Sequence, residues 1–273
     1  MSSPAPMPIP REHGAWGMLL QPFGAALIVA WQWNWAIPAA LAAVVVAFVL
    51  REPLLVLARQ RWLWRDPHPE TAAARQALAW ELPLLGVLGG LLLWRLPPMP
   101  VLALGGLAVA MTLLAVWATL KNKQRAVWLQ VLSGFCLSTT ALFAALAATG
   151  GFPWWAPWLW LLLALHSTAA IFVVHARLAA RMSAKKNARP RVKDAVAPQA
   201  LQFGLAGMAV PLYLPFALPI LFSAAMLTWE ALRLRKPEVL TEPLRRVGFR
   251  MLAIALAHTA LTIAALRLPI HHI

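Results

Sequence analysis

The residues best suited to chemistry stand in a charged segment just ahead of the first long apolar stretch. This segment reads Pro10-Arg11-Glu12-His13-Gly14-Ala15-Trp16. Glu12 and His13 are candidate catalytic groups, Glu12 as a base or a metal ligand. A helix that begins here presents its N-terminus, which favours a negative charge or an anionic ligand. The alternative is a solvated membrane boundary with Trp16 as its interfacial anchor.

A second charged group, Arg51-Glu52-Pro53, ends the next apolar stretch. Glu52 follows a strongly apolar run, so we expect it near the hydrocarbon boundary, where carboxylates are costly and usually paired. Arg11 and Arg51 are its expected partners. Glu52 is the third candidate catalytic group, and both structural pairing and ligand binding fit its position.

The other apolar stretches also turn polar abruptly at the ends predicted to lie on this same side. Basic groups outnumber acidic ones there, and such a ring of charge suits a phosphate, diphosphate or carboxylate. The alternative is the basic flanking that any cytoplasmic boundary carries. The candidate substrate-binding residues are Arg11, Arg51, Lys121, Asn122, His175 and Arg177.

Two histidines, His166 and His258, lie deep inside apolar stretches. Ionisable residues within a membrane are functional candidates by default. A proton relay requires the two side chains to lie close together; the alternative is a neutral histidine hydrogen-bonded to a neighbouring helix. The sequence indicates no metal site, because no acidic pair stands at four-residue spacing on an inner helix end. It identifies no cofactor.

Membrane-spanning helices must position these residues. Of the 273 residues, 61% are hydrophobic and 12% are charged, and the mean hydropathy is +0.69. The apolar blocks are long enough to cross about 30 Å of hydrocarbon and lack the alternation of barrel strands. The sequence predicts an all-α polytopic bundle, with a cytoplasmic segment (residues 1–13) and one transmembrane domain (residues 14–273). The nine predicted spans are 14–31, 35–50, 78–94, 100–120, 126–149, 154–175, 198–214, 216–232 and 248–266.

The distribution of positive charge predicts the orientation. Of the 24 Lys and Arg residues, all except Arg95 and Arg267 fall on one side of the spans. By the positive-inside rule that side is cytoplasmic, so the N-terminus lies inside and the C-terminus outside a bacterial inner membrane. The net charge of +15 therefore predicts anionic lipid head groups as the partner, and not nucleic acid.

Two local patterns bear on how the spans pack. Three prolines interrupt residues 198–232, which form either two spans or one re-entrant hairpin, and charge does not choose between them. Gly86 and Gly90 stand four residues apart, a spacing that lets helices approach closely. We expect that close approach within the bundle.

The opening segment, Pro10 to Trp16, resembles the start of the YwiC-like family of bacterial membrane proteins, and the Arg51-Glu52-Pro53 group supports the match. The topology more distantly resembles that of the UbiA-type intramembrane prenyltransferases. Those enzymes bind a prenyl diphosphate through magnesium, held by Asp-rich motifs in the loops after the second and sixth helices. Both motifs are missing here.

Two function classes follow from these features, and whether the protein is an enzyme stays undecided. The first is UbiA-like binding or transfer of an apolar substrate whose anionic head group meets the cytoplasmic ring of charge. The second is transport of an ion or small molecule, motivated by the proline-interrupted segment and the two deep histidines. A non-catalytic membrane assembly factor is a third alternative.

Overall fold

The structure is a computed structural model that describes residue 10 and residues 13–64, 66, 68–185 and 192–268. The regular structure of these residues is helical, which confirms the predicted all-α class. Seven segments are long and apolar enough to cross a membrane, and α1 is a shorter apolar helix. The helices are α1 (His13–Ala30), α2 (Ala36–Trp62), α3 (Glu70–Arg95), α4 (Pro98–Leu120), α5 (Val127–Leu137), α6 (Thr140–Thr149), α7 (Trp155–Lys185), α8 (Lys193–Leu212), α9 (Leu214–Arg233), α10 (Pro237–Leu240) and α11 (Leu244–Arg267).

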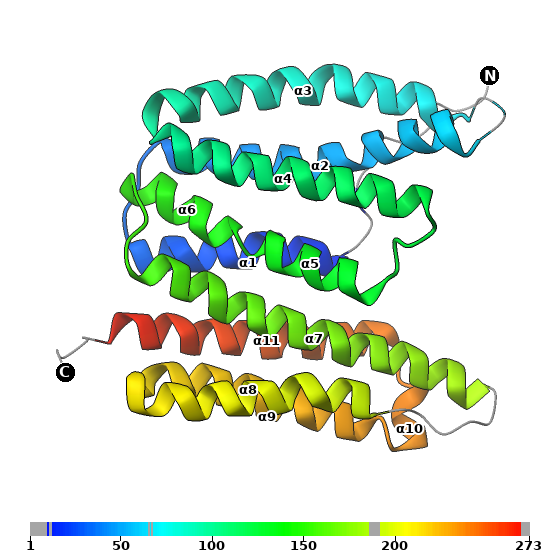
Figure 1. The fold of residues 1–273 in the computed structure, drawn as a ribbon, viewed down its shortest axis with the longest axis vertical. Coiled ribbons are helices and arrows are strands. Elements are labelled where there is room, and N and C mark those ends of the chain that lie inside the picture. Colours follow the sequence, from blue (N-terminus) through cyan, green and yellow to red (C-terminus); the bar gives the residue numbers. More distant parts are fainter. Residues whose placement is uncertain (1–9, 11–12, 65, 67, 186–191, 269–273) are drawn as a thin grey trace.

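The long helices run side by side, with α3 at one edge of the bundle and α8 and α9 at the other (Figure 1). Successive long helices run in opposite directions, and α5 and α6 together make one crossing. The C-terminal ends of α2, α4, α7 and α9 therefore lie at one end of the bundle, which we call the basic end. The opposite end carries the exposed Trp31, Trp33 and Trp154. No membrane orientation follows from the fold, so a cytoplasmic basic end stays a prediction.

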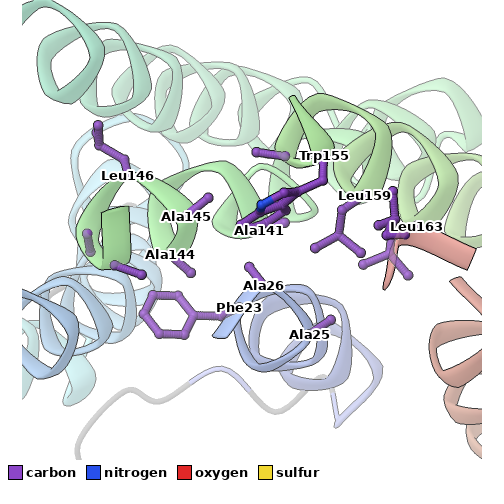
Figure 2. Close-up of a cluster of buried hydrophobic side chains, with 14 of the residues drawn as sticks. Phe23, Ala25, Ala26, Ala141, Ala144, Ala145, Leu146, Trp155, Leu159 and Leu163 are labelled. Carbon is purple, nitrogen blue, oxygen red and sulfur yellow. The ribbon is translucent and has the colours of Figure 1, made fainter. Parts of the chain in front are cut away.

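Small side chains bring the central helices close together. Ala25 and Ala26 of α1 meet Ala141, Ala144 and Ala145 of α6 in one buried cluster (Figure 2). Phe23 fills the space beside this alanine contact, and Leu159 and Leu163 of α7 extend the cluster. Without a hydrophobic driving force between helices in lipid, such close packing is a main source of association. It fixes α1 in the interior of the bundle.

Helix α2 extends beyond residue 50, where the second span is predicted to end. Helix α2 continues through Arg51-Glu52-Pro53 to Trp62. A proline inside a helix removes one backbone hydrogen bond, but the turns that follow it are held because Leu55, Val56 and Ala58 are buried. Hydropathy detects the part of a helix in hydrocarbon and misses its polar extension. Helices α3 and α7 likewise extend beyond the predicted third and sixth spans.

The segment 198–232 forms two full helices, α8 and α9, each of 20 residues. Each is about 30 Å long, the thickness of the hydrocarbon core. Tyr213, in the turn between them, donates from its hydroxyl to the carbonyl oxygens of Ala265 and Leu268 at the end of α11. The turn between α8 and α9 thus lies at the end of the bundle opposite the basic end. This agrees with two full crossings, because a re-entrant hairpin would turn back before reaching that end.

The expected packing at Gly86 and Gly90 is not found. A Cβ added at either glycine would meet no atom of another described residue within 4 Å, apart from its own chain neighbours and helix backbone. Within the part of the chain that the structure describes, this spacing therefore does not serve helix packing. Gly134 differs, because its Cβ would lie 3.0 Å from Ile171 Cδ1.

Candidate functional site

The two charged segments of the first half meet at one corner of the basic end. The Trp16 ring of α1 lies edge-on to Phe48 of α2, with centroids 4.9 Å apart. The Trp16 indole donates to the carbonyl oxygen of Pro10 (3.2 Å), and the Arg51 guanidinium lies 5.7 Å from the Phe48 centroid. Aromatic and cation–π contacts of this kind favour a fixed arrangement. The corner therefore holds the start of α1 against the middle of α2.

Five sequence-predicted site residues belong to this corner by sequence, and the side chains of three of them lie outside the described part of the chain. Arg11 and Glu12 lie outside the described residues. His13 begins α1, and its side chain is likewise outside the description. Glu52 pairs with its neighbour Arg51, Oε1 to Nη2, at 2.9 Å. The pairing expected of a carboxylate near hydrocarbon is thus present.

The remaining candidates of the predicted ring are spread over separate contacts. Lys121 and Asn122 are exposed in the turn after α4, where Asn122 takes a left-handed conformation (φ 54°). His175 Nε2 of α7 lies 2.7 Å from Gln130 Oε1 of α5. No hydrogen bond or ion pair between described residues joins Lys121, His175 and Glu52.

Arg177, the last candidate of the ring, belongs to an ion-pair network that sequence reasoning missed. Its side chain is buried and donates through Nη2 to the carbonyl oxygen of Val239 (2.6 Å) and to Glu242 Oε2 (3.0 Å). Arg250 lies at the centre of the network, because it donates to both carboxylates, Glu230 and Glu242. We call this network the arginine–glutamate cluster: Arg177, Arg181, Glu230, Arg233, Glu242 and Arg250.

The cluster joins α7, α9 and α11 to the loop between α10 and α11. Hydrogen bonds from Arg250, and next from Arg177, outweigh partial burial and lower the pKa of the Glu242 carboxyl to about 2. Glu230 is only 1% exposed. Two sequence signals point to this network: an acid in the last turns of an apolar helix, and an arginine two turns inside the final helix. Their pairing depends on the fold.

The deep histidines do come together. The rings of His166 (α7) and His258 (α11) stack with centroids 4.5 Å apart and planes inclined by 15°. Both side chains are buried. The closeness that a proton relay requires is therefore present, and we call these two residues the histidine pair.

The histidine pair is held by polar groups of α7 and α9. His166 Nδ1 lies 2.8 Å from the Ser223 hydroxyl of α9. His258 Nδ1 lies 3.0 Å from the carbonyl oxygen of Pro219, and its Nε2 lies 3.2 Å from that of Leu162. Leu162 is one helical turn before His166, and Pro219 is one turn before Ser223. The contacts therefore close a ring across α7, α9 and α11.

Helix α1 reaches this ring from the side. The Gln21 amide donates to the Ala255 carbonyl oxygen (2.9 Å) and to the Thr259 hydroxyl, next to His258 in sequence. These groups are uncharged. Among the described residues whose contacts with His258 are given above, His166 is the one with a titratable side chain.

The comparison with known families bears on the corner and not on the deeper groups. The YwiC-like protein family matches residues 9–145. The chain belongs to the YwiC-like family. Among curated proteins no relative matches it. In this YwiC-like protein the matched half contains α1 to α5 and the first turns of α6, whereas the histidine pair and the arginine–glutamate cluster lie beyond it, in α7 to α11.

Proposed function

We propose that this multi-pass membrane protein transports a small solute or ion and that proton binding at the histidine pair drives its cycle. The observation that carries the proposal is the stacking of two buried imidazoles between α7, α9 and α11. Ionisable residues at such depth are costly and usually mark ion or proton pathways.

The hydrogen bonds of His258 support a role in proton binding. Both ring nitrogens face carbonyl oxygens, which only accept. A neutral imidazole carries one N–H and satisfies one of these carbonyls, whereas the imidazolium donates to both. His166 has the Ser223 hydroxyl, which donates or accepts, so it tolerates either state. The pair is thus suited to bind one proton beyond its neutral form. His258 then becomes an imidazolium and donates to both carbonyl oxygens.

A conformational response to this proton has a structural basis in α9. Pro215 and Pro219 stand in or beside its first turns, and a proline inside a helix weakens it by removing an N–H donor. The Pro219 carbonyl oxygen is also the acceptor of His258 Nδ1. Loss of the proton removes one of the two bonds that tie α11 to α7 and α9. Proline-interrupted helices beside a mid-membrane site are a common device of transporters.

The test is proton flux in liposomes that contain the purified protein and a trapped pH-sensitive dye. With an imposed pH gradient, we expect flux that His166→Ala and His258→Phe reduce to the level of protein-free liposomes. The matched control is His68→Gln, since His68 is an exposed histidine in the loop before α3. Equal flux from the wild-type protein and folded variants of both histidines would rule out the proposal.

One observation favours the UbiA-like class of function, the binding of an amphiphile with an anionic head group. An apolar groove of about 340 Å³ lies between α2 and α4 near the basic end. Its wall includes Leu54, Leu57 and Leu113, and Arg61 and Trp62 line it as well. An apolar chain in this groove would bring its head group to Arg61. A prenyl diphosphate should then bind the protein in detergent, and Arg61→Ala should weaken that binding more than Arg59→Ala does.

A further inference from the structure

The arginine–glutamate cluster carries more positive than negative charge. Of its four arginines, Arg177, Arg233 and Arg250 share two carboxylates. The fourth, Arg181, donates to the backbone carbonyl oxygen of Glu242 and has no carboxylate partner among the described residues. Two positive charges are therefore in excess within a network whose deepest side chains, Arg177 and Glu230, are 3% and 1% exposed. Uncompensated charge in such surroundings is strongly destabilising.

Arg177 shows where the compensation is missing. Its Nη2 is engaged by Val239 and Glu242. Its Nε is buried and has no hydrogen-bond partner among the described residues. A buried N–H donor without an acceptor destabilises the fold, and it does so more when the donor belongs to a charged group than when it belongs to a neutral one. A water molecule would accept this bond but leave the excess charge, whereas an anion provides both the acceptor and the charge.

The surrounding helix geometry also favours an anion. Glu242 lies two residues before the first residue of α11, so one member of the cluster stands beside the N-terminus of a 24-residue helix. The first N–H groups of a helix have no partner within it, and its dipole favours negative charge at this end. Guanidinium groups match the oxygen spacing of phosphate and bind it through paired hydrogen bonds.

We propose that the arginine–glutamate cluster binds a phosphate-like oxyanion, with Arg177 Nε as a donor and the excess charge of the four arginines as the attraction. The same chemistry recognises free phosphate and the phosphate of a lipid head group. The site goes beyond the proposed transport function, because it lies about two helical turns from the histidine pair on α9 and α11. A flux assay and a binding assay therefore test the two ideas separately.

The experiment measures phosphate binding by calorimetry on the full chain in nanodiscs of zwitterionic lipid. A second arm measures enrichment of anionic phospholipid around the protein by native mass spectrometry. We expect binding in at least one arm. Binding of inorganic phosphate identifies a free oxyanion as the ligand; lipid enrichment without phosphate binding identifies a head group.

Three variants decide whether the cluster is the site. Arg177→Lys keeps the charge that Glu242 requires and removes the guanidinium Nε, so it should weaken binding by about tenfold or more. Glu242→Gln removes a competing carboxylate and should strengthen binding. Arg235→Gln, an exposed arginine at the same end of the bundle, should leave binding unchanged. Absence of binding in both arms, or equal binding by the wild-type protein and folded Arg177→Lys, would overturn the proposal.

Discussion

Glu230 offers the sharpest test of how the basic end is held together. Its carboxylate is buried and accepts three hydrogen bonds, two from Arg250 and one from Arg233. Removing one partner of a buried pair costs about 3–5 kcal/mol. Arg250 keeps Glu242, at 2.7 and 3.0 Å, and its side chain is 20% exposed. We therefore expect Glu230→Gln to lower the free energy of unfolding by about 3 kcal/mol, the lower end of that range.

The double variant Glu230→Gln/Arg250→Gln separates the pair from its surroundings. Much of the single-variant cost comes from a stranded charge, so the double variant should lose less than the sum of the two singles, with a coupling of about 2 kcal/mol. The assay is reversible unfolding in mixed micelles, followed by tryptophan fluorescence. Arg246→Gln, at an exposed position near the start of α11, should change stability by less than about 0.5 kcal/mol. Additive single costs, or a cost for Glu230→Gln no larger than that for Arg246→Gln, would refute the reasoning.

Two further predictions concern pH and packing. The pKa of Glu242 falls from 4.5 to about 2 on folding, so its carboxylate stabilises the folded state by about 3 kcal/mol or less. This contribution is complete above pH 4.5 and is lost as the pH falls toward 2. Unfolding titrations should show the loss in the wild-type protein and less of it in Glu242→Gln. Gly90→Ala should stabilise α3 by roughly 0.5–1 kcal/mol, since the added Cβ meets open space. Gly134→Ala should lose that gain because its Cβ meets Ile171, and the same unfolding titrations compare the two variants.

Hydropathy predicted the fold class well because it measures the property that lipid selects. The apolar blocks marked every membrane-length helix, including α8. The helix ends were predicted less well. Arg51 and Glu52 resemble a helix end in sequence, but in the fold they neutralise each other as an ion pair in mid-helix.

The candidate site was harder to predict because its contacts join residues far apart in sequence. His166 and His258 were recognised as candidates from their depth, but their stacking depends on the approach of α7 to α11. Glu242 looks like an ordinary loop carboxylate, yet α7 and α11 bring Arg177 and Arg250 to it. Charge patterns therefore predicted which end of the bundle is basic and did not predict which arginine pairs with which carboxylate.

The division between family-matched and unmatched halves is bridged by α1. Its first turn is fixed against α2 through Trp16 and Phe48, and five residues after Trp16 the Gln21 side chain bonds to α11 beside His258. An amide in lipid is costly without partners, so Gln21 ties the position of α1 to that of α11. The matched half thus supplies the framework, and the titratable groups of the proposed transport site come from the other half. The proposed transport function is therefore tested on α7, α9 and α11, which lie outside the residues matched by the family.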